Sequence, residues 1–228
     1  MSPLGFAPEE LLWPLNEAER KHAPPRLFVA GDRDLLRAAC CVAIVGSRKA
    51  SRDGLARSAR LAKLLVEHGS IVVSGLAEGI DTAAHTAAIE HGGGTIAVLG
   101  TPLDECFPAK NRALQERIAR DHLVVSQFAP GTKVGPHTFP MRNRTMALVA
   151  NTAVIVEASD ESGSINLGWE ALRLGRPLWI AASLFANKKL QFPAQLAHYG
   201  AQELSDAGLT AFFEQLPPGR RPPAELPL

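Results

Sequence analysis

Short apolar runs alternate with helical patterns along most of the chain, and this alternation most constrains what the chain can fold into. Strands buried on both faces of a parallel sheet read as continuous apolar runs, and parallel neighbours need helical crossovers between them. The pattern therefore predicts an α/β fold with a doubly wound, mostly parallel sheet. Strands are expected over 27–30, 42–46, 71–75, 95–100, 123–126, 154–158 and 177–181, and helices over 8–20, 55–69, 80–91, 109–120, 139–151 and 165–174.

A length of 228 residues accommodates one large domain with short extensions. We expect residues 24–205 to form this domain and residues 1–23 to form an N-terminal extension that packs on it. Residues 206–228 are expected to hold a C-terminal helix and a Pro-rich tail, mobile from residue 215. Residues 127–141 break the alternation with prolines and glycines, and an irregular insertion of this length is often functional.

The formal net charge of +1 means that no global field attracts nucleic acid or a membrane surface. Any basic binding surface must therefore be a local patch. Cys40, Cys41 and Cys106 lack the spacing of metal ligands, and we interpret the adjacent pair as buried thiols in a reducing compartment. Neither an apolar stretch of about 18 residues nor a signal-peptide pattern occurs. We expect a cytoplasmic protein without membrane association, metal or cofactor.

The early strands end in glycine or a small hydroxyl residue, at Gly46-Ser47, Ser74-Gly75, Gly100-Thr101 and Ser126. Open α/β sheets bind ligands just outside the carboxyl ends of their strands. Amides, hydroxyls and helix N-termini gathered at one such edge can hold an anion. Turns between strands and helices favour small residues for other reasons, so this pattern alone also fits plain turns.

Basic residues fall at the same strand ends, which favours phosphate as the anion. Arg48 follows the first of these ends, and Arg142 and Arg144 lie two residues apart near the start of a predicted helix. The planar fork of arginine suits phosphate oxygens. We expect one arginine of the second pair to be structural, with a carboxylate such as Glu157 as its partner, and the other to face a ligand.

Two lysines and one serine-rich segment adjoin this edge. Lys110 and Lys133 would extend a basic strip along it. Ser162, Gly163 and Ser164 open the helix over 165–174, where they fit either a helix cap or a phosphate site.

Asp81 and His85 lie one turn apart at the start of the helix over 80–91. A carboxylate in the first turn interacts favourably with the helix dipole, and residues four apart share one face. We interpret the two as a helix-stabilising pair. A metal site would need a third ligand, and none is apparent nearby.

Taken together, these motifs resemble the DprA/Smf family of bacterial DNA-processing proteins. The resemblance implies an extended Rossmann-like fold that binds single-stranded DNA with little sequence preference, protects it and helps to load the RecA recombinase in natural transformation and recombination. It also implies a homodimer without catalytic activity. It covers about residues 24–183 and rests on Val42–Arg48, Ser74–Asp81 with His85, Phe107-Pro108 with Asn111, Phe139-Pro140 with Arg142–Arg144, and Glu157 with Ser162–Ser164.

The strand ends and the resemblance together give one set of candidate DNA- or phosphate-binding residues. The set is Gly46, Ser47, Arg48, Ser74, Gly75, Lys110, Lys133, Arg142, Asn143, Arg144, Ser162, Gly163 and Ser164.

The chain departs from the family pattern mainly in the second half of the predicted sheet. Ile165–Gly168 replace the usual Leu-Ile-Thr-Ala, Ala181–Ser183 replace a Pro-Gly segment, and Gln127 stands in place of a glutamate. Residues 1–23 and 206–228 are also too short for the helical and winged-helix domains of typical members. These departures bear on dimerisation and on contact with RecA more than on the basic pocket.

The alternative function is a nucleotide sensor or a nucleotide phosphoribohydrolase that uses the same pocket, as in the related LOG-type folds. Those enzymes carry Pro-Gly-Gly-x-Gly-Thr-x-x-Glu, in which the glutamate assists hydrolysis. Gly163 to Glu170 keeps the distance from glycine to glutamate, but the proline, the second glycine and the Gly-Thr pair are missing. We therefore expect Glu170 to be an exposed helix residue, while a mononucleotide remains open as the ligand.

Overall fold

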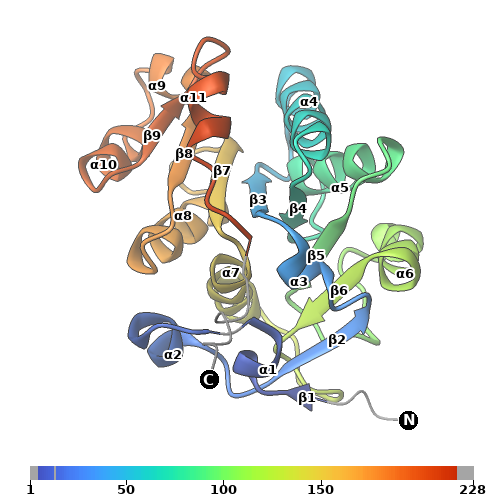
Figure 1. Ribbon diagram of the computed structural model, residues 1–228. Coiled ribbons are helices and arrows are strands. Elements are labelled where there is room, and N and C mark those ends of the chain that lie inside the picture. The colour runs from blue at the N-terminus through green and yellow to red at the C-terminus, as the bar shows by residue number, and fades with distance from the viewer. Residues whose placement is uncertain (1–4, 13, 220–228) are drawn as a thin grey trace, which may run out of the picture.

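A computed structural model describes residues 5–12 and 14–219, which form one nine-stranded sheet with helices on both faces (Figure 1). The strand order is β1-β2-β6-β5-β4-β3-β7-β8-β9. The strands β6, β5, β4, β3, β7, β8 and β9 are neighbours in this order and pair in parallel. At one edge, β2 pairs antiparallel with both β6 and β1. The predicted α/β fold with a doubly wound, mostly parallel sheet is confirmed.

The strands are β1 Gly5–Phe6, β2 Leu27–Gly31, β3 Cys41–Gly46, β4 Ile71–Ser74, β5 Thr95–Leu99, β6 Leu123–Ser126, β7 Thr152–Glu157, β8 Leu178–Ala181 and β9 Gln202–Leu204. The helices are α1 Pro8–Leu12, α2 Glu17–His22, α3 Leu35–Ala38, α4 Arg52–Glu67, α5 Ile80–Glu90, α6 Arg112–Asp121, α7 Thr138–Val149, α8 Gly163–Arg173, α9 Ala182–Ala186, α10 Phe192–His198 and α11 Leu209–Glu214. A 3₁₀ turn at Ala109–Asn111 precedes α6.

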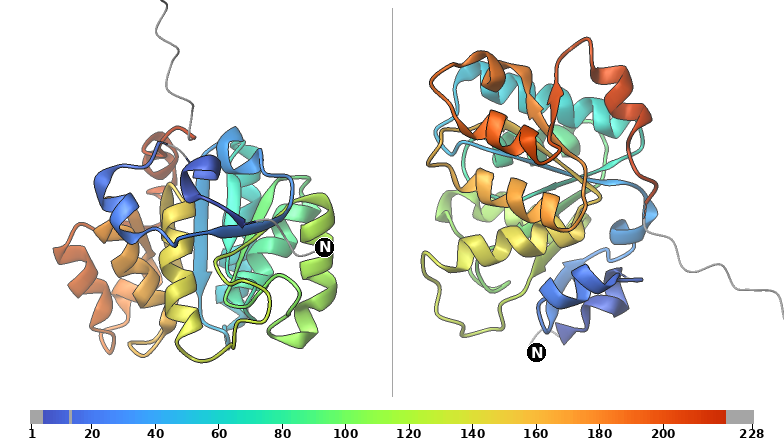
Figure 2. Two further views of the ribbon diagram at one scale, coloured as in Figure 1. Left: turned by 90° about the horizontal axis from the view of Figure 1, so that it is seen from below. Right: turned by 90° about the vertical axis from the view of Figure 1, so that its left-hand side faces the viewer.

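The strands alternate their side chains between two apolar layers, as the pleat of a β-strand requires. In β3, Val42 and Ile44 pack with residues of α4 and α5, whereas Ala43 and Val45 pack with residues of α7 and α8. Figure 1 shows α4, α5 and α6 on one side of the sheet, and Figure 2 shows α7 and α8 next to each other on the other side. The continuous apolar runs therefore reflect burial on both faces.

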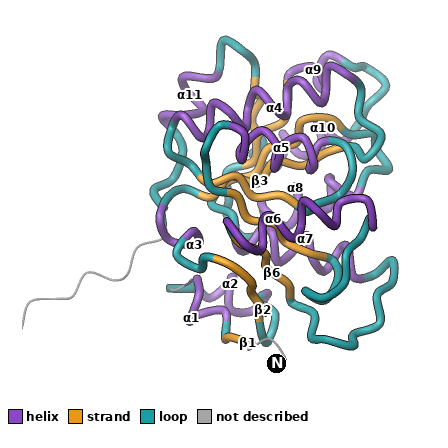
Figure 3. The backbone as a smooth tube through the Cα atoms, turned by 90° about the vertical axis from the view of Figure 1, so that its right-hand side faces the viewer, coloured by secondary structure: helices purple, strands orange, loops and turns teal. Residues whose placement is uncertain are grey.

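The chain changes direction across the sheet between β3 and β7. Strands β3 to β6 proceed outward in order, and the chain then returns to place β7 on the other side of β3. The helices that follow these two neighbours, α4 and α8, lie on opposite faces, so a crevice opens outside their carboxyl ends. Figure 3 shows the strands in the middle of the molecule with helices around them. The fold thus places the ends of β3 and β7 where doubly wound sheets bind ligands.

The N-terminal segment differs from its prediction. Instead of one helix over 8–20 it forms α1 and α2, because Pro14 between them cannot continue a helix and Asn16 starts α2 with a capping box to Glu19. The segment packs on the main sheet through buried Leu11 and Leu12. Its Glu19 also forms an ion pair with Arg176 after α8.

Short elements near the C-terminus were not predicted individually, namely α9, α10 and β9. At the other end, α3 and the two-residue strand β1 were also missed. The helix α11 lies in the segment where a C-terminal helix was expected, and residues 220–228 of the Pro-rich tail lie outside the described residues. None of the helices in 5–12 and 14–219 combines the length and the apolar character that crossing a bilayer would need.

Candidate nucleic-acid interface

A cleft of about 580 Å³ lies at the carboxyl edge of the sheet, where β3 and β7 end. Its walls come from the loops after these strands, from the turn between β4 and α5, from α7 and from the start of α8. Because parallel strands end at one edge, distant segments of the sequence meet here. Eight of the candidate residues line the cleft: Gly46, Ser47, Arg48, Arg142, Asn143, Ser162, Gly163 and Ser164.

Arg48 is an exposed cation of this cleft, as is its neighbour Lys49. Its guanidinium carbon lies 5.2 Å from the centroid of the Phe139 ring, an arrangement that orients the group by a cation–π interaction. Within the described part of the chain, no carboxylate lies at ion-pairing distance from Arg48. Its N–H donors therefore remain available to an anion that enters the cleft.

Glu157 at the end of β7 fixes the loop that carries Arg48. The Ser47 amide donates to the Glu157 carbonyl at 2.7 Å, and the Ser51 amide donates to Glu157 Oε1 at 2.8 Å. The Ser51 hydroxyl bonds the other carboxylate oxygen, and Arg57 Nη2 lies 3.7 Å from it. The arginine that pairs with Glu157 is thus Arg57 of α4. It is neither Arg142 nor Arg144, for which Glu157 was the suggested partner.

Gly79 joins this loop to the turn between β4 and α5. Its φ is +75°, and a Cβ built there would lie 2.3 Å from the Ser47 carbonyl oxygen. The amide of the next residue, Ile80, donates to the same oxygen at 3.2 Å. Only glycine permits both this backbone conformation and this close approach.

We expect Gly79→Ala to lower the free energy of unfolding by about 1–3 kcal/mol, since it adds both a strained φ and a steric clash with backbone. Urea denaturation followed by circular dichroism measures the change. Gly163→Ala is the matched control, because a Cβ at Gly163 meets no heavy atom within 4 Å. We expect that variant to stay within about 1 kcal/mol of the parent protein. Equal effects of the two substitutions would contradict the packing role of Gly79.

Arg142, unlike Arg48, is buried, with 6% of its surface exposed. Its Nη1 donates to the carbonyl oxygens of Gly75 at 2.5 Å and Val98 at 3.0 Å, and its Nε donates to Asn143 Oδ1 at 3.1 Å. A Cβ at Gly75 would lie 1.7 Å from Nη1, so this glycine makes room for the guanidinium. Arg142 therefore joins the ends of β4 and β5 to α7 beneath the cleft.

The buried charge of Arg142 faces Asp81 in the first turn of α5. The amides of Gly75 and Ala77 donate to Asp81 Oδ2 at 3.1 and 3.3 Å. Burial raises the pKa of Asp81, whereas the Arg142 charge and these hydrogen bonds oppose that rise. Burial likewise lowers the pKa of Arg142, and the Asp81 carboxylate opposes this change. Asp81 and Arg142 thus compensate each other's charge in the floor of the site.

The predicted Asp81–His85 pair is replaced by two separate sets of contacts. His85 is fully buried, and its Nδ1 lies 2.8 Å from the hydroxyl of Thr95. Burial lowers the pKa of His85 to about 3, so the ring is neutral at physiological pH. Asp81 interacts electrostatically with Arg142 instead. His85, one turn later in α5, contacts Thr95 at the start of β5.

Arg144 lies on a different side of α7, against α8. Its Nη2 is 3.5 Å from Glu170 Oε1, and Arg173 Nη1 is 3.1 Å from the same oxygen. Glu170 has only 4% of its surface exposed, so the expectation of an exposed helix residue was wrong. The packing of α7 on α8 buries this carboxylate between two arginines. Neither Arg144 nor Glu170 lines the cleft.

The other candidate residues outside the cleft are Ser74, Gly75, Lys110 and Lys133. The Ser74 hydroxyl is fully buried and donates to the Ile44 carbonyl at 2.6 Å, so it links strand β4 to strand β3 inside the sheet. Exposed Lys110 pairs with Glu78, with Nζ 2.7 Å from Oε2. Lys133 is exposed in the loop before α7. DNA contact by these residues stays a prediction.

Ser162 caps α8 at the cleft. Its Oγ accepts from the Ser164 amide at 3.4 Å and lies 2.7 Å from the Ser164 hydroxyl. Asn143 Nδ2 donates to the Gly163 carbonyl at 2.9 Å, which holds the start of α8 against α7. The positive end of the helix therefore borders the same cleft as Arg48, where an anion is favoured.

Several cleft residues were missed by the sequence reasoning. Phe139 is the most informative, because it lies three residues before Arg142, a spacing that places two helical residues on one face. An aromatic side chain among basic ones was the available signal. The other missed residues at the cleft include Lys49, Ser159, Glu161 and Asn166.

Comparison with known proteins gives consistent matches. The family model described as DNA recombination-mediator protein A matches residues 6–214. DNA processing protein DprA of Streptococcus pneumoniae is 42% identical over 167 residues, covering 73% of this chain and 58% of that protein. DprA of Bacillus subtilis is 32% identical over 194 residues, covering 85% and 65%. The chain thus spans less than two thirds of the length of these relatives.

Solved structures agree with these matches. The X-ray structure of S. pneumoniae DprA superposes with a TM-score of 0.79 at 34% identity, covering 92% of this chain and 74% of that one. A structure of Helicobacter pylori DprA, described for its single-stranded DNA binding mode, superposes with a TM-score of 0.76 at 27% identity, covering 90% and 94%. The molybdenum cofactor carrier protein of Chlamydomonas reinhardtii shares the fold alone, with a TM-score of 0.55 at 22% identity over 78% and 97% of the chains.

Proposed function

The chain belongs to the DNA recombination-mediator protein A family, also called DprA/Smf, and we propose that it binds single-stranded DNA in the cleft at the carboxyl edge of the sheet. The observation that carries this proposal is the state of Arg48, an exposed cation held over Phe139 without a carboxylate partner in the described residues. The H. pylori relative, described for its single-stranded DNA binding mode, supports the same ligand.

The chemistry of the cleft fits a phosphodiester backbone better than a particular base sequence. Arg48 supplies a charged fork for phosphate oxygens, and the start of α8 at Gly163 supplies the positive end of a helix dipole. Contacts to phosphate position a nucleic acid without reading its sequence. A protein with a formal net charge of +1 and a local cationic cleft would therefore bind single strands with little sequence preference.

The cellular role is part of the same proposal. Binding would protect single-stranded DNA and assist recombinase loading during natural transformation and recombination, with RecA as a partner and a homodimer as the active form. We propose a cytoplasmic DNA-binding protein and not an enzyme. The curated relatives named DNA processing protein DprA support this role.

A nucleotide phosphoribohydrolase receives less support from the geometry. The glutamate that such a mechanism would use, Glu170, is buried between Arg144 and Arg173 and does not line the cleft. A mononucleotide could still enter the cleft through its phosphate, so the experiment below compares both ligands.

The test measures fluorescence anisotropy of a labelled oligothymidylate across a series of salt concentrations, with mononucleotides as competitors. We expect the affinity to fall steeply with salt, with a log–log slope of about −0.7 for each phosphate contact of a single strand. A mononucleotide should compete weakly, because it offers one phosphate group only. Tighter binding of a mononucleotide than of the oligonucleotide, or release of free base from it, would refute the proposal.

A further inference from the structure

Phe107 is an exposed aromatic residue in the loop between β5 and α6, with 52% of its surface in contact with solvent. A single exposed apolar side chain is common in soluble proteins and needs no partner. The position of Phe107 is nevertheless specific, because its neighbours link it to the cleft.

An ordered series of side chains runs from the cleft to Phe107. The Arg48 guanidinium lies over the ring of Phe139, and the Phe139 centroid is 5.4 Å from that of Phe107 at an interplanar angle of 50°. Phe139 is itself fixed, since a Cβ at Gly100 would lie 2.7 Å from its ring. Phe107 therefore rests on a positioned neighbour and leaves much of its surface open.

A small hollow of about 80 Å³ connects these groups, with Arg48, Gly75, Phe107 and Phe139 in its lining. Glu78 borders the same hollow and forms the ion pair with Lys110. The Lys110 and Glu78 side chains are 62% and 40% exposed, and exposed ion pairs contribute little stability. A phosphate next to Phe107 could therefore take Lys110 as its partner at low cost.

From this arrangement we propose that Phe107 is a stacking platform for a nucleobase, and that the DNA strand passes from the cleft over Arg48 toward Phe107 and Lys110. The inference rests on the proposed function and deepens it by assigning a base contact and a path. Every base has a π-face, so stacking on an aromatic ring adds affinity without sequence preference. The cleft would hold phosphates, while Phe107 would hold a base.

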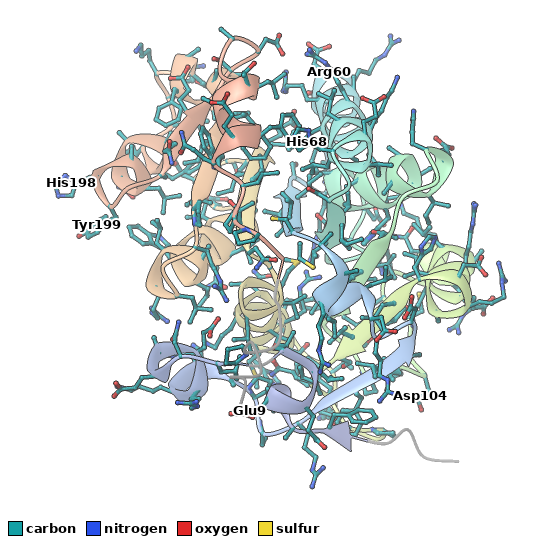
Figure 4. The ribbon with its side chains drawn as sticks, in the orientation of Figure 1. Glu9, Arg60, His68, Asp104, His198 and Tyr199 are labelled. Carbon is teal, nitrogen blue, oxygen red and sulfur yellow. The ribbon has the colours of Figure 1, made fainter. Side chains whose placement is uncertain are left out.

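Phe107→Ala should weaken binding of the oligothymidylate about tenfold, the effect of losing one stacked base. The salt dependence should stay the same, since the ring carries no charge. Phe107→Trp should restore the affinity, because it retains an aromatic face. Tyr199→Ala is the matched control: Tyr199 is 65% exposed, and Figure 4 shows it pointing outward near α10, away from Asp104 in the loop before Phe107. That substitution should leave the affinity unchanged.

A second oligonucleotide with the same phosphates but abasic sugars separates stacking from other effects. The parent protein should bind it more weakly than oligothymidylate, and Phe107→Ala should bind it as the parent does. Equal weakening of both DNAs by Phe107→Ala, or no weakening of either, would overturn the inference. If Arg48→Ala weakens binding but Phe107→Ala does not, the proposed function stands without the stacking role. If the parent protein binds no oligonucleotide, both proposals fail.

Discussion

Arg142→Ala is expected to lower the free energy of unfolding by about 3–5 kcal/mol, because it leaves a buried carboxylate without its cation. Asp81 has 4% of its surface exposed and cannot gain hydration without a change of structure. The carbonyls of Gly75 and Val98 lose their side-chain donor at the same time. Urea denaturation followed by circular dichroism at neutral pH measures the loss.

Two further variants identify the cause of this loss. Adding Asp81→Asn to Arg142→Ala removes the uncompensated charge and should recover at least about 1 kcal/mol. Arg60→Ala removes a surface arginine, which is 58% exposed and pairs with Asp206, and should change stability by less than about 1 kcal/mol. Figure 4 shows Arg60 on α4 at the periphery. If Arg142→Ala is as stable as Arg60→Ala, Arg142 does not hold the floor of the site.

Arg48→Ala is expected to weaken single-stranded DNA binding about 10- to 100-fold, since hydrogen bonds between charged groups contribute about 1.5–3 kcal/mol each. Stability should change little, because the Arg48 side chain is exposed and has no carboxylate partner in the described residues. Arg48→Lys keeps the charge but loses the planar fork, and should bind with intermediate affinity. Anisotropy at fixed salt compares the three proteins.

Arg60→Ala also serves as the control for binding, because it removes the same charge from the middle of α4, at a residue that does not line the cleft. Its affinity for the oligonucleotide should match that of the parent protein. If Arg48→Ala binds as tightly as Arg60→Ala does, the cleft is not the DNA site.

The position of the cleft could be predicted from the sequence because it follows from local patterns. The run from Val42 to Val45 is apolar at every position, which fits a strand buried on both faces, and Gly46-Ser47-Arg48 follows directly. Parallel strands end at one edge, so the segments around Asn143 and Ser162 could be assigned to the same place. The structure confirms that these segments line one cleft.

A difference between Arg142 and Arg144 could be predicted from their spacing, but not which ligand-facing role either would take: Arg142 is buried, and Arg144 pairs with Glu170 outside the cleft. Residues two apart on an α-helix point in directions about 200° apart, so one side chain faces the core when the other does not. Which one is buried depends on how α7 packs between the sheet and α8, and the sequence does not encode that locally. The same packing buries Glu170, which the local pattern placed at the surface.

The missed elements have a similar cause. Strand β9 has three residues and exists through its parallel pairing with β8, where Ile180 lies opposite Glu203. Helix α10 has seven residues, too few to be stable alone, and it is held by buried Phe192 and Leu196. Tertiary contacts, more than local propensity, determine such short segments.

The most direct test of the central claim is the salt dependence of DNA binding in the parent protein and in Arg48→Ala. If Arg48 neutralises one phosphate, the slope of log Kobs against log salt should be less steep by about 0.7 in the variant. Arg60→Ala should keep the slope of the parent protein. Identical slopes and affinities for the parent protein and Arg48→Ala would show that Arg48 does not contact the DNA backbone, and would contradict the assignment of this cleft.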